Sequence, residues 1–200
     1  MLLDDSLPTY DISMRHSIRI NASAKDIHRS VKELRFEEIS PVVKILFDLR
    51  ALPERQFKSS YPAIAAQNKD TGTLPFLEQL FSIGFVLLGD IPGSELVFGL
   101  IVPGEIGRFW KKSNSTLLKI MGADEFKEFN HPEYVKVVCN FLVSETDADG
   151  ITRLSTESRI QALCSTAKKS FSAYWRVIHP GSALIRWFWL RAIKRRAEKS

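Results

Sequence analysis

The sequence contains few of the residues and motifs by which a function is usually recognised. Only two cysteines, Cys139 and Cys164, occur among its 200 residues, too few for a disulfide framework or a cysteine-based metal site. None of the four histidines lies at metal-ligand spacing from another. We therefore expect a reduced, cytosolic setting, with no metal and no cofactor.

Motifs of nucleotide binding and of hydrolysis are also missing. The chain has no P-loop, no Gly-x-Gly-x-x-Gly fingerprint and no Gly-x-Ser-x-Gly elbow. The first ten residues contain neither a basic region nor an apolar run, so we expect no signal peptide. The apolar stretch from Phe81 to Val102 is interrupted by Asp90, Pro92 and Glu95, which indicates a folded hairpin rather than a membrane span.

The overall composition is that of a globular protein. Hydrophobic residues make up 44% of the chain and charged residues 26%, which predicts a single domain over residues 1–200 with a substantial core. The net charge is +5, and much of the excess is local. It lies near the C-terminus, at Arg186, Arg191, Lys194, Arg195, Arg196 and Lys199. Because no known nucleic-acid module surrounds these residues, we expect no nucleic-acid partner.

The longest periodic pattern also lies at the C-terminus, between Cys164 and Lys199. Its apolar and small residues recur at three- and four-residue steps, as on one face of a helix. This stripe consists of Ala167, Phe171, Tyr174, Trp175, Ile178, Ser182, Ile185, Trp189 and Ile193. It stays in phase across Pro180, which removes one backbone hydrogen bond. The pattern therefore predicts one long helix, kinked near His179.

The second half of this helix is apolar on more than one side. Leu184, Trp187, Phe188 and Leu190 lie off the stripe, and a helix that is apolar all round needs a cover. One interpretation is that residues 54–76 or 113–130 pack over it. The other is a membrane-surface or dimer contact, with the basic residues meeting anionic headgroups.

The N-terminal half begins with a loose lead-in over residues 1–11. Alternating apolar residues over 12–21 predict a strand, and Ser23 is a good N-cap for a helix that follows. A second helix is predicted from Ser40, with Pro41 in its first position, to Leu52.

The middle of the chain predicts strands joined by hairpins. Residues 81–89 and 95–102 flank Ile91-Pro92-Gly93-Ser94, a type II turn pattern, and both faces of this hairpin are apolar. Residues 54–76 are a loop or a short helix, and residues 113–130 contain a helical patch that ends at Phe129.

The clearest hairpin closes on the turn from Asp147 to Gly150. Strict alternation on both sides places Phe141 opposite Thr156 on one face, and Asn140 opposite Glu157 on the other face. The register set by the turn and the register set by the apolar pattern agree. The order of elements predicts an α+β fold, in which a curved antiparallel sheet wraps around a long, kinked C-terminal helix.

This order, together with four short segments, resembles the START-like or SRPBCC superfamily, the helix-grip fold of polyketide cyclases and lipid-transfer domains. The detailed likeness is to a bacterial branch whose members are mainly uncharacterised. The segments are residues 154–159, 174–178, 180–186 and 190–198, with a weaker likeness at 130–141. The resemblance implies a cavity between the sheet and the long helix that holds an apolar small molecule or lipid. It implies no catalytic residues.

Large and small apolar residues on the inward faces are therefore either packed core or the wall of a cavity. The candidate ligand-binding residues are Phe85, Leu87, Phe98, Leu100, Cys139, Phe141, Thr156, Phe171, Tyr174, Trp175 and Ile178. Besides the resemblance, the small residues among them favour a cavity.

Three charged or titratable residues have two interpretations each. Glu157 and Arg159 share a strand face; outside they form a structural ion pair, and inside they would be buried charges that need a ligand. The predicted register puts them outside. His179, at the kink, faces away from the stripe and either makes local hydrogen bonds or binds.

The sequence thus favours a binding protein for an apolar small molecule or lipid. The first alternative is an enzyme of the same fold, such as a cyclase or dehydratase, which uses polar groups inside the cavity. The second is a peripheral membrane or oligomerisation module that works through the C-terminal helix.

Overall fold

The computed structural model describes residues 1–40, 74–82, 84–104, 122–144 and 146–199. Its elements, in chain order, are α1 (Leu2–Ser6), β1 (Ile12–Ile20), α2 (Ala24–Glu33), the short 3-10 helix η1 (Phe36–Glu38), α4 (Phe76–Ser82), β2 (Val86–Ile91), β3 (Glu95–Pro103), α6 (Ala123–Glu128), β4 (Tyr134–Val143), β5 (Thr152–Ala162) and α7 (Ser165–Ala197).

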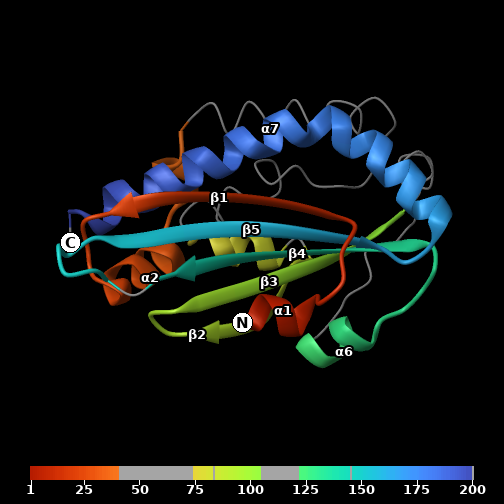
Figure 1. The fold of residues 1–200 in the computed structure, drawn as a ribbon, viewed down its shortest axis with the longest axis horizontal. Helices are drawn as coiled ribbons and strands as arrows, with labels where there is room; N and C mark the ends of the chain where they lie inside the picture. The colour runs from red at the N-terminus through yellow and green to blue at the C-terminus, as the bar shows by residue number, and fades with distance from the viewer. Residues whose placement is uncertain (41–73, 83, 105–121, 145, 200) are drawn as a thin grey trace.

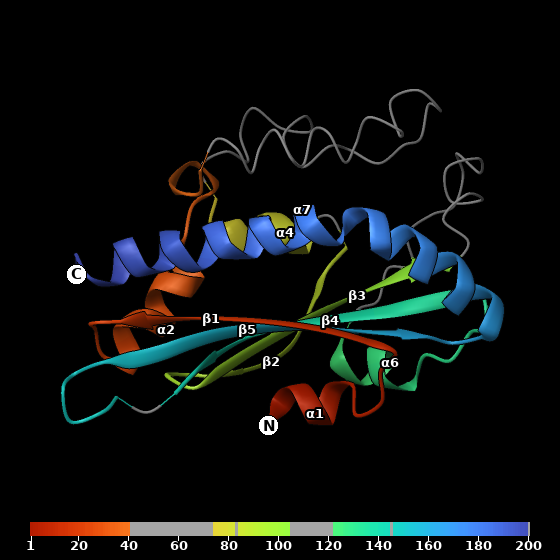
Figure 2. The ribbon, with the colours of Figure 1, turned by 45° about the horizontal axis from the view of Figure 1, so that its top comes forward.

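The five strands form one antiparallel sheet in the order β1-β5-β4-β3-β2 (Figure 1). The long helix α7 runs along one face of this sheet, and α1 and α6 lie on the opposite face (Figure 2). We call these the α7 face and the outer face. The predicted α+β fold, a sheet packed against a long C-terminal helix, is confirmed.

The predicted register of β4 and β5 is also confirmed. Phe141 pairs with Thr156 on the α7 face, and Asn140 pairs with Glu157 on the outer face. The turn that joins the strands is held by Asp147, whose carboxylate accepts a hydrogen bond of 2.8 Å from the backbone N–H of Ile151. An aspartate at the start of a turn commonly makes such a contact.

The hairpin of β2 and β3 closes as predicted but begins later. Gly93 has a φ of 74° and the N–H of Ser94 donates to the carbonyl of Ile91 at 3.0 Å, as a type II turn requires. Phe81, which we predicted to open the first strand, instead belongs to α4.

Helix α4 ends in a Schellman motif at Gly84, whose φ is 104°. The N–H of Gly84 donates to the carbonyl of Phe81, and the N–H of Phe85 donates to that of Leu80, both at 3.2 Å. A short apolar run such as this one does not distinguish helix from strand by its period, which explains why the boundary was misplaced.

Residues 1–11 are not a loose lead-in, which is a second correction. Residues 2–6 form α1, and Leu3 and Leu7 are buried on the outer face. They pack with Val97, Ile101 and Val138 of the sheet, and with Phe126 of α6, in a cluster that we call the outer core. A helix of five residues is too short to show a helical period in the sequence.

The cap of the helix after β1 is confirmed. The side chain of Ser23 accepts a hydrogen bond from the N–H of Asp26 at 3.1 Å, and Ile27, Val31 and Leu34 are buried. The second helix that we predicted from Ser40 lies outside the described residues. Helix α6 ends before Phe129 as predicted.

The C-terminal pattern forms one helix, α7, with Pro180 inside it, and Figure 1 shows that this helix bends along its length. Ala167, Phe171, Ile185, Trp189 and Ile193 of the predicted stripe are buried. Leu190, which we placed off the stripe, is buried together with Ile185, Trp189 and Ile193, and Phe188 packs against these buried residues. Leu184 and Trp187 are exposed.

The α7 face carries two separate apolar clusters. The large core lies under the C-terminal half of α7 and gathers residues of the sheet, α2, α4 and α7, among them Ile27, Phe76, Phe98, Phe141 and Trp189. The small core lies under the start of α7 and consists of Val135, Ile160, Ala167 and Phe171. The candidate site lies where these two cores meet.

The two tryptophans near the C-terminus of α7 give a matched test of this packing. Trp189 is 6% exposed and contacts the rings of Phe76 and Phe141, whereas Trp187 is 42% exposed and contacts Phe188 and Arg191. We expect Trp189→Ala to lower the free energy of unfolding by about 3–5 kcal/mol, and Trp187→Ala by about 1 kcal/mol or less. Denaturant titration measures both. Equal losses would contradict the placement of α7.

Candidate functional site

The surface between the two cores is incompletely buried. Val137 lies on β4, the central strand of the sheet, and packs against both cores, yet it is only half-buried. Its neighbour on β3, Leu100, is half-buried too. On the helix, Ile178 and Ser182 are half-buried at and after the bend. Residues in such a central position are normally closed off from solvent.

The predicted ligand-binding residues divide between the two cores. Phe98, Cys139 and Phe141 belong to the large core, where Phe85 also packs, with its ring 5.8 Å from that of Phe98. Phe171 belongs to the small core.

The other predicted residues do not form one group, and one of them, Leu87, belongs to neither core. Tyr174 and Trp175 border the small core, and Trp175 stacks on Phe171 at 6.2 Å. Leu87 lies on the edge strand β2 and is 45% exposed. The structure therefore brings most of the predicted set to the α7 face, in two groups.

A group of polar residues lies on the α7 face beside this half-buried surface. The guanidinium of Arg186, on α7, donates to the hydroxyl of Thr156 and contacts the sulfur of Cys139, both at 3.2 Å. The sulfur of Cys139 in turn lies 3.2 Å from the hydroxyl of Ser158. Three adjacent β4 and β5 side chains are thus joined to one buried cation from the helix.

His16 belongs to the same group. It pairs across the strands with Thr156, and burial, the charge of Arg186 and the charge of His179 lower its pKa from the ordinary value of 6.5. A neutral imidazole next to a guanidinium avoids two like charges in a poorly solvated place. We call Arg186, His16, Cys139, Thr156 and Ser158 the inner polar cluster.

Unsatisfied nitrogen atoms concentrate in and around this cluster. In the described ranges, five buried side-chain nitrogen or oxygen atoms have no hydrogen-bond partner. Two of them, on His28 and Asp90, lie 2.8 Å apart and contact each other. The other three are Nε of Arg186, Nδ1 of His16 and Nε1 of Trp189, and the guanidinium of Arg186 lies 5.4 Å from the ring of Trp189.

Sequence reasoning missed the two charged members of the cluster. We counted Arg186 with the terminal basic residues, although it lies four residues after Ser182 and three before Trp189, and so belongs to the inward stripe. His16 falls among the alternating residues of β1, but nothing in its sequence surroundings connects it with Arg186. The helical spacing was the available signal, and only the fold joins it to β1.

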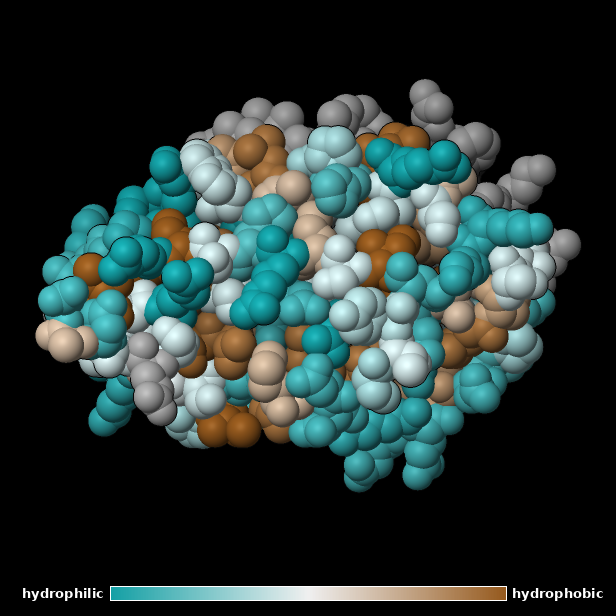
Figure 3. Space-filling model, viewed as in Figure 1, coloured by the Kyte–Doolittle hydropathy of each residue, from teal (hydrophilic) through white to brown (hydrophobic). Residues whose placement is uncertain are grey.

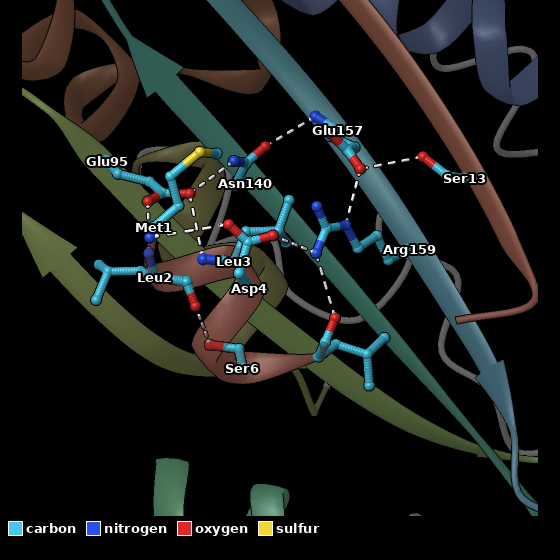
Figure 4. Close-up of polar contacts among 11 residues, drawn as sticks. Met1, Leu2, Leu3, Asp4, Ser6, Ser13, Glu95, Asn140, Glu157 and Arg159 are labelled. Atoms are coloured by element: carbon cyan, nitrogen blue, oxygen red, sulfur yellow. Dashed lines mark hydrogen bonds and ion pairs between the residues drawn. The ribbon is translucent and has the colours of Figure 1, made fainter. Parts of the chain in front are cut away.

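Glu157 and Arg159 form the structural ion pair that the sequence favoured. They lie on the outer face, 2.8 Å apart, and both are buried because α1 covers them (Figure 4). Arg159 also contacts the carboxylate of Asp4 at 2.8 Å. Burial by itself lowers the pKa of Arg159, but the hydrogen bonds and charges of Glu157 and Asp4 outweigh it and raise the pKa.

Glu95 anchors the other end of α1. Its carboxylate accepts hydrogen bonds from the N–H groups of Leu2 at 2.7 Å and Leu3 at 3.3 Å, and from the side chain of Asn140 at 2.8 Å (Figure 4). Asn140 accepts from the N–H of Glu157 at 2.8 Å. Every polar group of this network has a partner, so it fixes α1 to the sheet rather than binding a ligand.

Lys136 is a further buried cation on the outer face. Its ammonium donates to the carbonyl of Lys127 at 2.9 Å and lies 5.4 Å from the ring of Phe126. Burial lowers its pKa. These contacts hold α6 against the sheet, and they account for the position of Lys136 without a ligand.

The terminal basic residues are largely paired within the chain. The pairs are Arg196 with Glu33 and Glu38, Lys194 with Glu198, and Arg195 with the carbonyl of Glu38. On the face seen in Figure 3, hydrophobic residues form separate groups among hydrophilic ones. Among the described residues, no helix is both long and apolar enough to cross a membrane. A membrane-surface or dimer contact stays a prediction.

The outer network gives a test of α1 as a structural element. Replacing Arg159 by methionine leaves Glu157 buried without its cation, so we expect the free energy of unfolding to fall by about 3 kcal/mol or more. Arg153→Met, at an exposed position of the same strand, is the control and should change stability little. Chemical denaturation measures both. A loss below 1 kcal/mol for Arg159→Met would contradict the network.

The lowered pKa of His16 predicts a specific pH dependence. Between its folded pKa and the unfolded value near 6.5, the unfolded chain binds more protons, so stability falls as the pH falls through this window. Asp11 and Glu198, whose pKa values are also lowered, act in the same direction. We therefore expect His16→Gln to lose less thermal stability than the wild type between pH 7 and pH 5. Identical losses would contradict the lowered pKa.

Comparisons with known proteins do not identify the chain. No family model and no curated protein matches its sequence. Among solved structures, the crystal structure of the hypothetical protein jhp0584 from Helicobacter pylori aligns with a TM-score of 0.36 and 8% sequence identity, covering 94% of this chain and 89% of that one. A likeness at this level carries no argument about function, which therefore rests on the geometry described above.

Proposed function

We propose that the protein binds an apolar small molecule or lipid between its sheet and α7. The observation that carries this proposal is the half-burial of Val137 and Leu100, paired on the sheet, and of Ile178 on α7, at positions between the two cores. In an ordinary two-layer fold the central strand lies under the densest packing. Here Val137, on the central strand, is only half-buried.

The free energy of apolar burial favours a ligand at this place. Each square ångström of apolar surface removed from water contributes roughly 25 cal/mol. The half-buried side chains still expose apolar surface, which a ligand would remove from water. Small residues occur on the same elements, namely the paired Cys139 and Ser158 on β4 and β5 and Ser182 on α7, and the aromatic residues Phe141 and Trp175 belong to or pack against the two cores. Binding sites for small apolar molecules commonly combine such walls with a few polar groups.

The resemblance to the START-like superfamily supports the same proposal from the sequence. Those proteins are helix-grip folds, and the order of sheet and terminal helix in this chain agrees with that fold class. Membership in the superfamily is itself part of the proposal, because it rests on the short segments around β5 and α7.

A second candidate function is an enzyme of cyclase or dehydratase type. The specific observation in its favour is His16, an imidazole with a lowered pKa and a buried nitrogen that lacks a partner. A neutral imidazole near a buried cation is suited to accept a proton from a bound substrate. This candidate uses the same site, so it does not compete with ligand binding but adds chemistry to it.

The binding proposal predicts that the neutral, environment-sensitive dye N-phenyl-1-naphthylamine binds to the protein. Trp175 packs against the small core on the same helix as Ile178. Trp175→Ala should therefore raise the dissociation constant of the dye roughly tenfold, the equivalent of about 1.4 kcal/mol of binding free energy. Fluorescence titration gives both dissociation constants.

Trp187→Ala is the matched control, because Trp187 is on the same helix but exposed to solvent. It should bind the dye like the wild type, and long-chain fatty acids should displace the dye from both. If the wild type does not bind the dye at all, the region between the cores is filled by side chains and the proposal is wrong.

A further inference from the structure

We infer that the inner polar cluster binds the oxyanion of an amphipathic ligand, a carboxylate or a phosphate monoester, through Arg186. This inference rests on the proposed function and adds the chemical class of the ligand. Its basis is a buried guanidinium whose contacts in the structure are incomplete.

Arg186 lacks the partner that a buried cation needs. It is 9% exposed, and its hydrogen bonds to the Thr156 hydroxyl and the Cys139 sulfur, like its contact with the Trp189 ring, are with neutral groups. Within the described part of the chain no carboxylate forms an ion pair with it, and its Nε is buried without a hydrogen bond. A guanidinium has five N–H donors, so most of its hydrogen-bonding capacity remains for a ligand.

Arg159, a buried arginine on β5, shows what a self-sufficient site looks like. Arg159 is buried to the same degree, and it contacts two carboxylates at 2.8 Å and the carbonyl of Leu7 at 3.3 Å. Among the described residues, the fold therefore supplies acidic partners for Arg159 on the outer face and none for Arg186 on the α7 face. Removing a cation from water is expensive unless it is paired, which indicates that the partner of Arg186 comes from outside the chain.

The surroundings of Arg186 suit an anion. Thr156, which holds one end of the guanidinium, is the cross-strand neighbour of His16, whose Nδ1 is also buried without a partner. Carboxylates and phosphates accept two parallel hydrogen bonds from a guanidinium. An oxyanion at this place would also favour protonation of His16, so that it could donate a further hydrogen bond.

The adjoining surface sets the other half of the ligand. Val137 lies two residues before Cys139 on β4, about 7 Å along the strand. Ile178 lies eight residues before Arg186 on α7, about 12 Å along the helix. The half-buried apolar residues therefore lie about 7 Å from the polar cluster along the strand and about 12 Å from it along the helix. An acidic head with an apolar chain attached can span both distances.

Three ligands of equal chain length separate the head from the tail: decanoate and decyl phosphate, each below its micelle concentration, and decanol below its solubility limit. We expect calorimetric titration of the wild type to show at least one of the two anions binding about tenfold or more tightly than decanol, the effect of a charge-assisted hydrogen bond. Which anion binds more tightly tells a carboxylate ligand from a phosphate ligand.

Variants of Arg186 test whether this residue causes the preference. Arg186→Met should bind decanol like the wild type but lose the preference for the anion. Arg186→Lys keeps the charge without the planar fork, and should retain part of the preference. Arg191→Met removes an exposed arginine of the same helix and should behave as the wild type.

Thermal unfolding gives a second readout, and its comparison of the ligand-free proteins does not depend on affinity. Because Arg186→Met removes an unpaired buried charge, the ligand-free variant should unfold at a temperature equal to or above that of the wild type. The preferred anion should raise the melting temperature of the wild type but not that of the methionine variant.

The outcomes distinguish this inference from the proposed function. If wild-type protein binds decanol and both anions equally, or if Arg186→Met keeps the anion preference, the inference is wrong and the apolar site remains. If Arg186→Met unfolds at a much lower temperature, Arg186 is a structural residue and the inference is again wrong. If none of the three ligands binds, the proposed function itself fails.

Discussion

The pairing of β4 with β5 is the constraint on which the rest of this structure depends. Because side chains alternate between the faces of a sheet, this register assigns Thr156 and Ser158 to the α7 face and Glu157 and Arg159 to the outer face. A slip of one residue would exchange the two sets. The carboxylate of Glu157 would then face the apolar residues of α7, and α1 would lose its anchor on the sheet.

Two buried arginines show that the two faces of the sheet offer different partners to a buried cation. On the outer face, Arg159 is surrounded by acidic groups from β5 and α1, and the contacts close a network that holds the N-terminal helix. On the α7 face, the described hydrogen-bond partners of Arg186 are the neutral groups of Thr156 and Cys139, and half-buried apolar residues lie nearby on β4 and α7. Completed networks stabilise a fold, whereas an incomplete one indicates that something else binds there. The contrast between two residues of the same type, both buried, supports a ligand on one face only.

Much of the framework was predictable because it depends on local patterns. The turn at Asp147, the alternation of β4 and β5, the cap at Ser23 and the continuous stripe of α7 are all properties of short segments. Elements whose stability comes from distant partners were missed. Helix α1 forms where Glu95, far along the chain, accepts its first N–H groups, and α4 occupies residues whose apolar run has no distinctive period.

The candidate site shows the same division. The sequence by itself determined which residues face inward along β4, β5 and most of α7, since the periods of 2 and 3.6 are set by backbone geometry. It also identified most of the aromatic residues on the α7 face. Only the tertiary structure decided that Arg186 lies over Thr156 and Cys139, next to His16, because these residues come from three separate strands and a helix. Whether a buried charge is paired depends on which side chains the fold brings within a few ångströms of it, and no local pattern contains that information.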